Sequence, residues 1–136
     1  MKKFFSFLIL IVSISLISCS EDDPKTYDLQ NTTWYRMMTV EGEVHEVRLA
    51  FRENIYYFTW PYGPPEGHAD SEAKFSISFG EFSIGANDDA DCEGQAATYG
   101  WSIAGDILVL NAKSDDCEGR MIAISQVWQK LDNVPN

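Results

Sequence analysis

The sequence has few positive charges. It contains 10 lysines and arginines against 21 aspartates and glutamates, so its formal net charge at pH 7 is −11. Proteins that bind DNA or RNA neutralise phosphates with lysine and arginine, so this charge balance argues against nucleic acid as a partner. Histidine is also scarce, and the 2 that are present leave few imidazole ligands for a transition metal.

Motifs of the common enzyme classes are missing as well. The chain has no glycine-rich phosphate loop, no Gly-x-Ser-x-Gly nucleophile elbow and no His-Glu-x-x-His zinc motif. We therefore expect a protein that is not an enzyme and that needs no cofactor.

A single long apolar run stands at the start of the chain. Two lysines precede residues 4–17, which are apolar apart from serines, and the run ends at Cys19. It is shorter than the roughly 20 residues that cross a bilayer core, and its layout is that of a secretion signal. Removal of residues 1–18 would leave 118 residues with a formal charge of −13, enough for one compact domain.

The end of this signal, Leu16-Ile17-Ser18-Cys19, resembles the lipobox of bacterial lipoproteins. The resemblance implies that Cys19 carries an acyl chain such as palmitate and anchors the protein in a Gram-negative cell envelope, in the outer membrane. An ordinary signal peptide with a chance cysteine is the alternative. Residues 19–28 are polar and acidic and are expected to form a flexible tether, in which Glu21-Asp22-Asp23 fits an export signal to the cell surface.

Two further cysteines, Cys92 and Cys117, remain for the folded domain. In an oxidising compartment such a pair favours a disulfide, which would close a loop of about 25 residues and stabilise the fold by roughly 3.5 kcal/mol. Both cysteines lie in an Asp-Cys-Glu-Gly motif, which also suggests a metal site, but zinc would need two more ligands from His45 and His68. We expect the disulfide and no metal.

From Leu29 onward, short alternating runs separated by Gly, Pro, Asn and Asp are typical of β-strands. We predict an all-β domain over residues 29–132, followed by a tail at 133–136. Eight strands without a covering helix are most simply arranged as an antiparallel up-and-down barrel, because closure removes exposed edges. The predicted strands cover residues 31–38, 44–51, 55–60, 73–79, the segments around 82–84 and 98–101, and residues 107–110 and 120–130.

In such a barrel, successive loops alternate between the two ends. The long loops 61–70, 87–94 and 112–119 follow the third, fifth and seventh strands, so all three belong to one end, which we call the mouth. Cys92 and Cys117 fall at this same end.

The domain resembles the lipocalin-like domains of small bacterial lipoproteins. The matching residues are Leu29, Thr33-Trp34, Gly105-Asp106, Leu108, Leu110, Asp116-Cys117, Gly119-Arg120 and Trp128. Thr32 stands where lipocalins have a glycine. The resemblance implies that Trp34 plugs the closed end of the barrel near Trp128 and Lys130, with a cationic side chain over its indole.

Aromatic residues around the mouth are the candidate ligand contacts. Exposed rings can stack on sugars or insert into a partner, although they can equally fold back as a lid. The candidate set is His45, Tyr57, Trp60, Tyr62 and His68. We expect a binding module for a small apolar or glycan-like ligand; the alternative is a lipoprotein that contacts another envelope protein through its long loops.

Carboxylates near the two histidines give a further alternative. Asp88, Asp89, Asp91 and Asp116, with His45 and His68, have side chains that could hold a cation or supply a general base. The spacing does not match an EF-hand, and solvated loop side chains are the simpler interpretation.

Overall fold

The computed structural model describes residues 29–78 and 80–132. The predicted signal peptide, Cys19, the acidic tether and the tail at 133–136 lie outside these residues.

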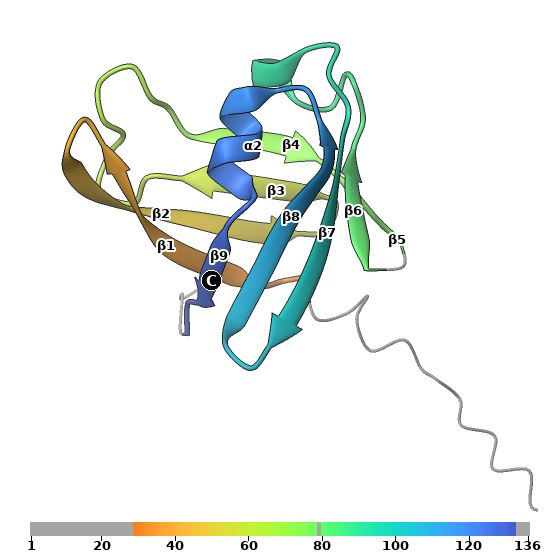
Figure 1. Ribbon diagram of the computed structural model, residues 1–136, viewed down its shortest axis with the longest axis horizontal. Helices are drawn as coiled ribbons and strands as arrows, with labels where there is room; N and C mark the ends of the chain where they lie inside the picture. Colours follow the sequence, from red (N-terminus) through yellow and green to blue (C-terminus); the bar gives the residue numbers. More distant parts are fainter. Residues whose placement is uncertain (1–28, 79, 133–136) are drawn as a thin grey trace, which may run out of the picture.

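The described residues form one antiparallel sheet and two short helical segments (Figure 1). The sheet has nine strands in the order β4-β3-β2-β1-β9-β8-β7-β6-β5. The elements are β1 Thr33–Val40, β2 Glu43–Arg52, β3 Ile55–Thr59, β4 Ser71–Lys74, β5 Ser76–Ser78, β6 Glu81–Ile84, the 3-10 helix η1 Ala90–Cys92, β7 Ala97–Ala104, β8 Ile107–Asp115, α2 Glu118–Ile124 and β9 Val127–Lys130.

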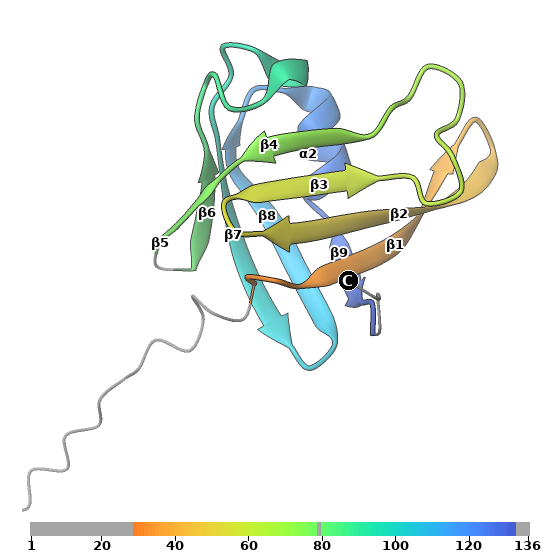
Figure 2. The same ribbon diagram turned by 180° about the vertical axis from the view of Figure 1, so that it is seen from behind.

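The sheet curls into a nearly closed barrel. Its two outermost strands, β4 and β5, follow each other in the chain, so the sheet returns to its starting point (Figures 1 and 2). A bridge between Ala73 and Asp89 partly closes the seam, where the Lys74 N–H donates to the Asp88 carbonyl oxygen at 3.1 Å. The prediction of an all-β antiparallel meander that closes on itself is confirmed at this level.

The strand count differs from the predicted eight because the fourth strand is divided at Phe75. β4 pairs with β3, whereas β5 pairs with β6, so the chain changes partner between them. The Phe75 N–H donates instead to the Asn54 carbonyl oxygen at 2.8 Å. Its buried ring packs edge to face on Phe51 and Phe82, and this packing turns the chain inward at the seam.

A second difference is at the end of the chain. Residues 120–130 were predicted to form one strand, but helix α2 occupies Glu118–Ile124 and only β9 is extended. Arg120 and Ile124 are the buried residues of α2, and their spacing of four places them on one face. A helix of two turns gives too short a periodic pattern to be distinguished from a strand by sequence. α2 lies across the mouth of the barrel (Figure 1).

A large aromatic side chain is buried at the end of the barrel opposite the mouth. Trp34 is fully buried there, and its indole N–H donates to Thr32 Oγ1 at 2.7 Å, so the threonine supplies an acceptor that glycine would lack. Trp34 is paired in register with Lys130, as expected. The cation, however, lies over the other indole: the Arg36 guanidinium is 5.1 Å from the ring centroid of Trp128.

Candidate functional site

A pocket of about 580 Å³ opens at the mouth of the barrel. Its walls come from β3, the loop 61–70, helix α2 and the segment around η1. The lining residues are Met38, Tyr56, Phe58, Trp60, Gly67, His68, Ala69, Ser71, Asp89, Asp91, Cys92, Cys117, Gly119, Arg120, Ile122, Ala123 and Ile124.

One wall is aromatic because of strand alternation. Tyr56, Phe58 and Trp60 are two residues apart, so their side chains share the inner face. The rings of Phe58 and Trp60 meet edge to face with centroids 5.7 Å apart. All three side chains line the pocket.

The long loop fixes the orientation of Trp60. The Trp60 backbone N–H donates to Asp70 Oδ1 at 2.8 Å, and the indole N–H donates to the Ala69 carbonyl oxygen at 3.1 Å. The His68 ring packs on the same indole, with centroids 5.4 Å apart. The loop 61–70 therefore folds back against Trp60 and holds its indole in one orientation.

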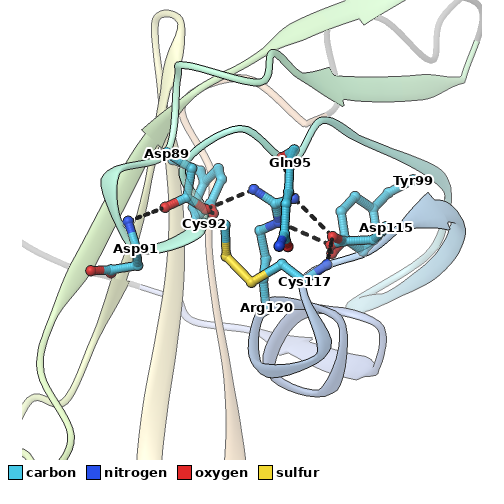
Figure 3. Close-up of a disulfide and its surroundings, with 9 residues drawn as sticks. Asp89, Asp91, Cys92, Gln95, Tyr99, Asp115, Cys117 and Arg120 are labelled. Atoms are coloured by element: carbon cyan, nitrogen blue, oxygen red, sulfur yellow. Dashed lines mark hydrogen bonds and ion pairs between the residues drawn. A yellow bond between two sulfur atoms is a disulfide. The ribbon is translucent and has the colours of Figure 1, made fainter.

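The opposite wall is helix α2, and a disulfide holds its N-terminal end. Cys92 on η1 and Cys117 just before α2 are bonded, with Cα atoms 5.9 Å apart, which confirms the predicted pairing (Figure 3). Ile122, Ala123 and Ile124 line the pocket from the helix. The disulfide thus ties the helical wall to the loop after β6.

A buried ion-pair network lies behind the disulfide. Arg120 is 6% exposed; its guanidinium donates to Asp89 Oδ2 at 2.9 Å, and to the two oxygens of Asp115 at 2.9 and 2.8 Å. A further hydrogen bond of 2.8 Å reaches the Gln95 carbonyl oxygen, and the Tyr99 hydroxyl donates to Asp115 (Figure 3). The fork of one arginine therefore joins three segments of the mouth.

The electrostatics of this network favour fixed protonation states. Burial alone would raise the pKa of Asp115, but hydrogen bonds from Arg120, Tyr99 and the Cys117 backbone outweigh it and hold that pKa below its usual value. Burial would lower the pKa of Arg120, and the two carboxylates raise it. Burial raises the pKa of Tyr56 and Tyr99, with Asp89 and Asp115 adding to the effect. These groups are suited to holding structure rather than to transferring protons near neutral pH.

The structure brings three of the five candidate ligand contacts together. Trp60 and His68 line the pocket, and the His45 ring meets the edge of Trp60 with centroids 5.9 Å apart. Tyr57 lies on the outer face of β3, since its neighbours Tyr56 and Phe58 point inward.

Tyr62 also lies outside the pocket and is 83% exposed. With Met37, Val44 and His45 it borders a second, smaller hollow of about 290 Å³ beside the β1–β2 turn.

The carboxylates proposed as a cation site do not converge. Asp89 is bound to Arg120, and the Asp88 carboxylate accepts the Gly85 N–H at 3.1 Å. In residues 29–78 and 80–132, no group of three or more His, Cys, Asp and Glu side chains is arranged to hold a metal ion.

Sequence reasoning missed Arg120 and Tyr56 as residues of the mouth. Arg120 had a usable signal, because it is the sole cation in the segments 61–70, 85–96 and 115–120, which together hold nine acids. A lone arginine among so many carboxylates is expected to pair with some of them. Tyr56 had no such signal, because β3 is aromatic on both faces.

Comparison of the chain with known protein families, with curated proteins and with solved structures finds no match. Among the described residues, no helix has the length and apolar character needed to cross a membrane.

Proposed function

We propose that this protein is a lipid-anchored envelope lipoprotein whose barrel binds a small ligand in the pocket at its mouth. The observation that carries the proposal is the contrast between the two ends of the barrel. At the far end Trp34 is fully buried, whereas the mouth has a pocket whose aromatic wall faces apolar side chains of helix α2.

The size and lining of the pocket support a small-molecule ligand. Sites for such ligands are concave and mostly apolar, with volumes of roughly 300 to 1,000 Å³ and a few fixed polar groups. The pocket here is of about 580 Å³, and its rings and helix side chains favour an apolar body. A glycan-like ligand would use the same rings, because sugar faces stack on aromatic side chains.

The charged groups of the mouth support a binding role rather than a catalytic one. Arg120 and its two carboxylate partners are engaged with each other, and Cys92 and Cys117 are joined in a disulfide. A general acid or base needs a pKa near the working pH and a free position next to the substrate. We therefore propose a module that binds its ligand without chemical change.

A dye titration tests the binding site. N-phenyl-1-naphthylamine, an apolar dye, should bind the oxidised mature protein with a stoichiometry of one and gain fluorescence. Ala123→Phe fills the pocket from α2 and should abolish binding. Ala104→Phe adds the same ring on the exposed surface of β7 and should have no effect. Equal binding by both variants would overturn the site.

The lipid anchor has its own test. Cells expressing the full chain are fed an alkyne analogue of palmitate, and the label is detected on the purified protein. The label should be present in the natural chain and absent from Cys19→Ser. Protease treatment of intact cells then tests exposure: digestion supports display on the outer surface, and full protection contradicts it.

A second function is favoured by an exposed apolar patch. Met37 is 57% exposed and Val44 61% exposed, and they lie beside Tyr62 at the hollow near the β1–β2 turn. Clustered apolar residues on a rim are typical of protein contacts, so the protein would then be an interaction lipoprotein. Val44→Lys should abolish crosslinking to an envelope partner while leaving dye binding unchanged.

A further inference from the structure

The mouth of the barrel has a strong excess of negative charge. Three segments frame it, residues 61–70, 85–96 and 115–120, and they contain nine acids and one cation. The acids are Glu66, Asp70, Asp88, Asp89, Asp91, Glu93, Asp115, Asp116 and Glu118, and the cation is Arg120.

The positive charge of Arg120 is already matched. Its guanidinium is paired with Asp89 and Asp115, and its side chain is buried behind the disulfide. Asp91 also lines the pocket, and no ion pair holds its carboxylate among the residues that the structure describes. The charge left over on the pocket lining is therefore negative.

This charge discriminates between ligands of the same shape. An anion would meet repulsion from the rim acids, a neutral molecule would be indifferent to them, and a cation would be attracted. The aromatic wall of Tyr56, Phe58 and Trp60 acts in the same direction, because ring faces attract cations. One such contact strengthens binding by about twofold to thirtyfold.

We propose that the pocket is selective for organic cations, that is, amines or quaternary ammonium compounds with an apolar body. The apolar body lies between the β3 rings and α2, and the charged group lies toward Asp91. This inference rests on the proposed binding function and narrows it to one chemical class.

Three probes of nearly equal shape test the charge selectivity. 4-Phenylbutylamine is a cation, 4-phenylbutanol is neutral and 4-phenylbutyrate is an anion. Calorimetric titration of the oxidised mature protein at low salt should give a saturable affinity for the amine that is about tenfold higher than for the alcohol, with the anion weakest. A higher salt concentration should lower the affinity for the amine and leave the affinity for the alcohol unchanged, because screening acts only on charges.

Two charge variants locate the effect. Asp91→Asn should lower the affinity for the amine by about fivefold to tenfold and leave the affinity for the alcohol unchanged. Asp106→Asn removes the same charge from the β7–β8 turn at the other end of the barrel, so its amine affinity should stay within about twofold of the natural protein.

The outcomes separate this inference from the function on which it rests. If the alcohol or the anion binds with the same affinity as the amine, the proposed charge selectivity is wrong and the proposed binding function stands. If both variants lose amine affinity equally, the attraction belongs to the whole molecule and the proposed role of Asp91 is wrong. If none of the three probes binds and the dye does not bind either, both proposals fall.

Discussion

The guanidinium of Arg120 lies 2.9 Å from Asp89 Oδ2, and this contact fastens helix α2 to the loop after β6. The disulfide between Cys92 and Cys117 joins the same two segments. One wall of the pocket is therefore held by both a covalent link and a buried ion pair, and it is the wall that closes the mouth.

Replacement of Arg120 tests how much its ion pairs stabilise the fold. Arg120→Met leaves Asp89 and Asp115 buried without a cation, so we expect the free energy of unfolding to fall by about 3 to 5 kcal/mol. Arg36→Met is the matched control, since Arg36 also points inward but leaves no buried carboxylate behind. Urea unfolding should show a smaller loss of stability in Arg36→Met than in Arg120→Met. Equal losses in the two variants would contradict a stabilising role for the Arg120 network.

The pH dependence of stability tests the state of Asp115. The pKa of Asp115 is lower in the folded protein than in the unfolded chain, where an aspartate carboxyl group has a pKa of about 3.9. The ionised Asp115 therefore contributes fully to the free energy of unfolding above about pH 4, and this contribution is lost as the pH falls through the folded-state pKa. The natural protein should exceed Asp115→Asn in stability at pH 6, and this difference should shrink at pH 3. A difference that stays constant would refute the lowered pKa.

Removal of the disulfide should have a large effect for a domain of this size. The bond spans 25 residues, and the Cys92→Ser, Cys117→Ser double variant should lose about 3.5 kcal/mol. Reductant should destabilise the natural protein to a similar extent and leave the double variant unchanged. If reductant also destabilised the double variant, the loss could not be assigned to this bond.

Substitution of single aromatic residues should distinguish those that contact the ligand in the pocket from those on the surface. Trp60→Leu should weaken dye binding by about fivefold, because an aromatic contact is worth on the order of 1 kcal/mol beyond its buried area. Tyr57→Leu and Tyr62→Leu remove rings that lie outside the pocket, so both should bind within about twofold of the natural protein. A loss of dye affinity of about fivefold in Tyr62→Leu, with none in Trp60→Leu, would place the site at the second hollow instead.

The arrangement of the barrel could be predicted because its signals are local and repeated. Alternation in Val47, Leu49 and Phe51 gives the inner face of β2, and all three are buried. Cys92 and Cys117 could be paired because they are the two cysteines left for the folded domain, and the order of short strands independently places both at one end of the barrel.

Three features could not be predicted, each for a physical reason. Helix α2 is too short for its periodicity to stand out, and its apolar residues suit a strand equally well. On β3 both faces carry aromatic rings, so nothing in the sequence favoured Tyr56 over Tyr57 as the inward residue. For Arg120 the sequence signal favours an ion pair but not its partners, because Asp89, Gln95 and Asp115 come from segments that meet only in the folded chain.

The most direct test of the binding pocket is an NMR titration of the protein from residue 19 onward that follows the indole N–H signals of its four tryptophans. The Trp60 indole N–H lies in the pocket wall and Trp34 lies at the opposite end of the barrel. On addition of N-phenyl-1-naphthylamine, the Trp60 signal and the backbone amides of Ile122 and Ala123 should shift together and saturate, while the Trp34 signal stays in place. Shifts confined to Met37, Val44 and Tyr62, or no shift at all, would contradict a ligand site at the mouth.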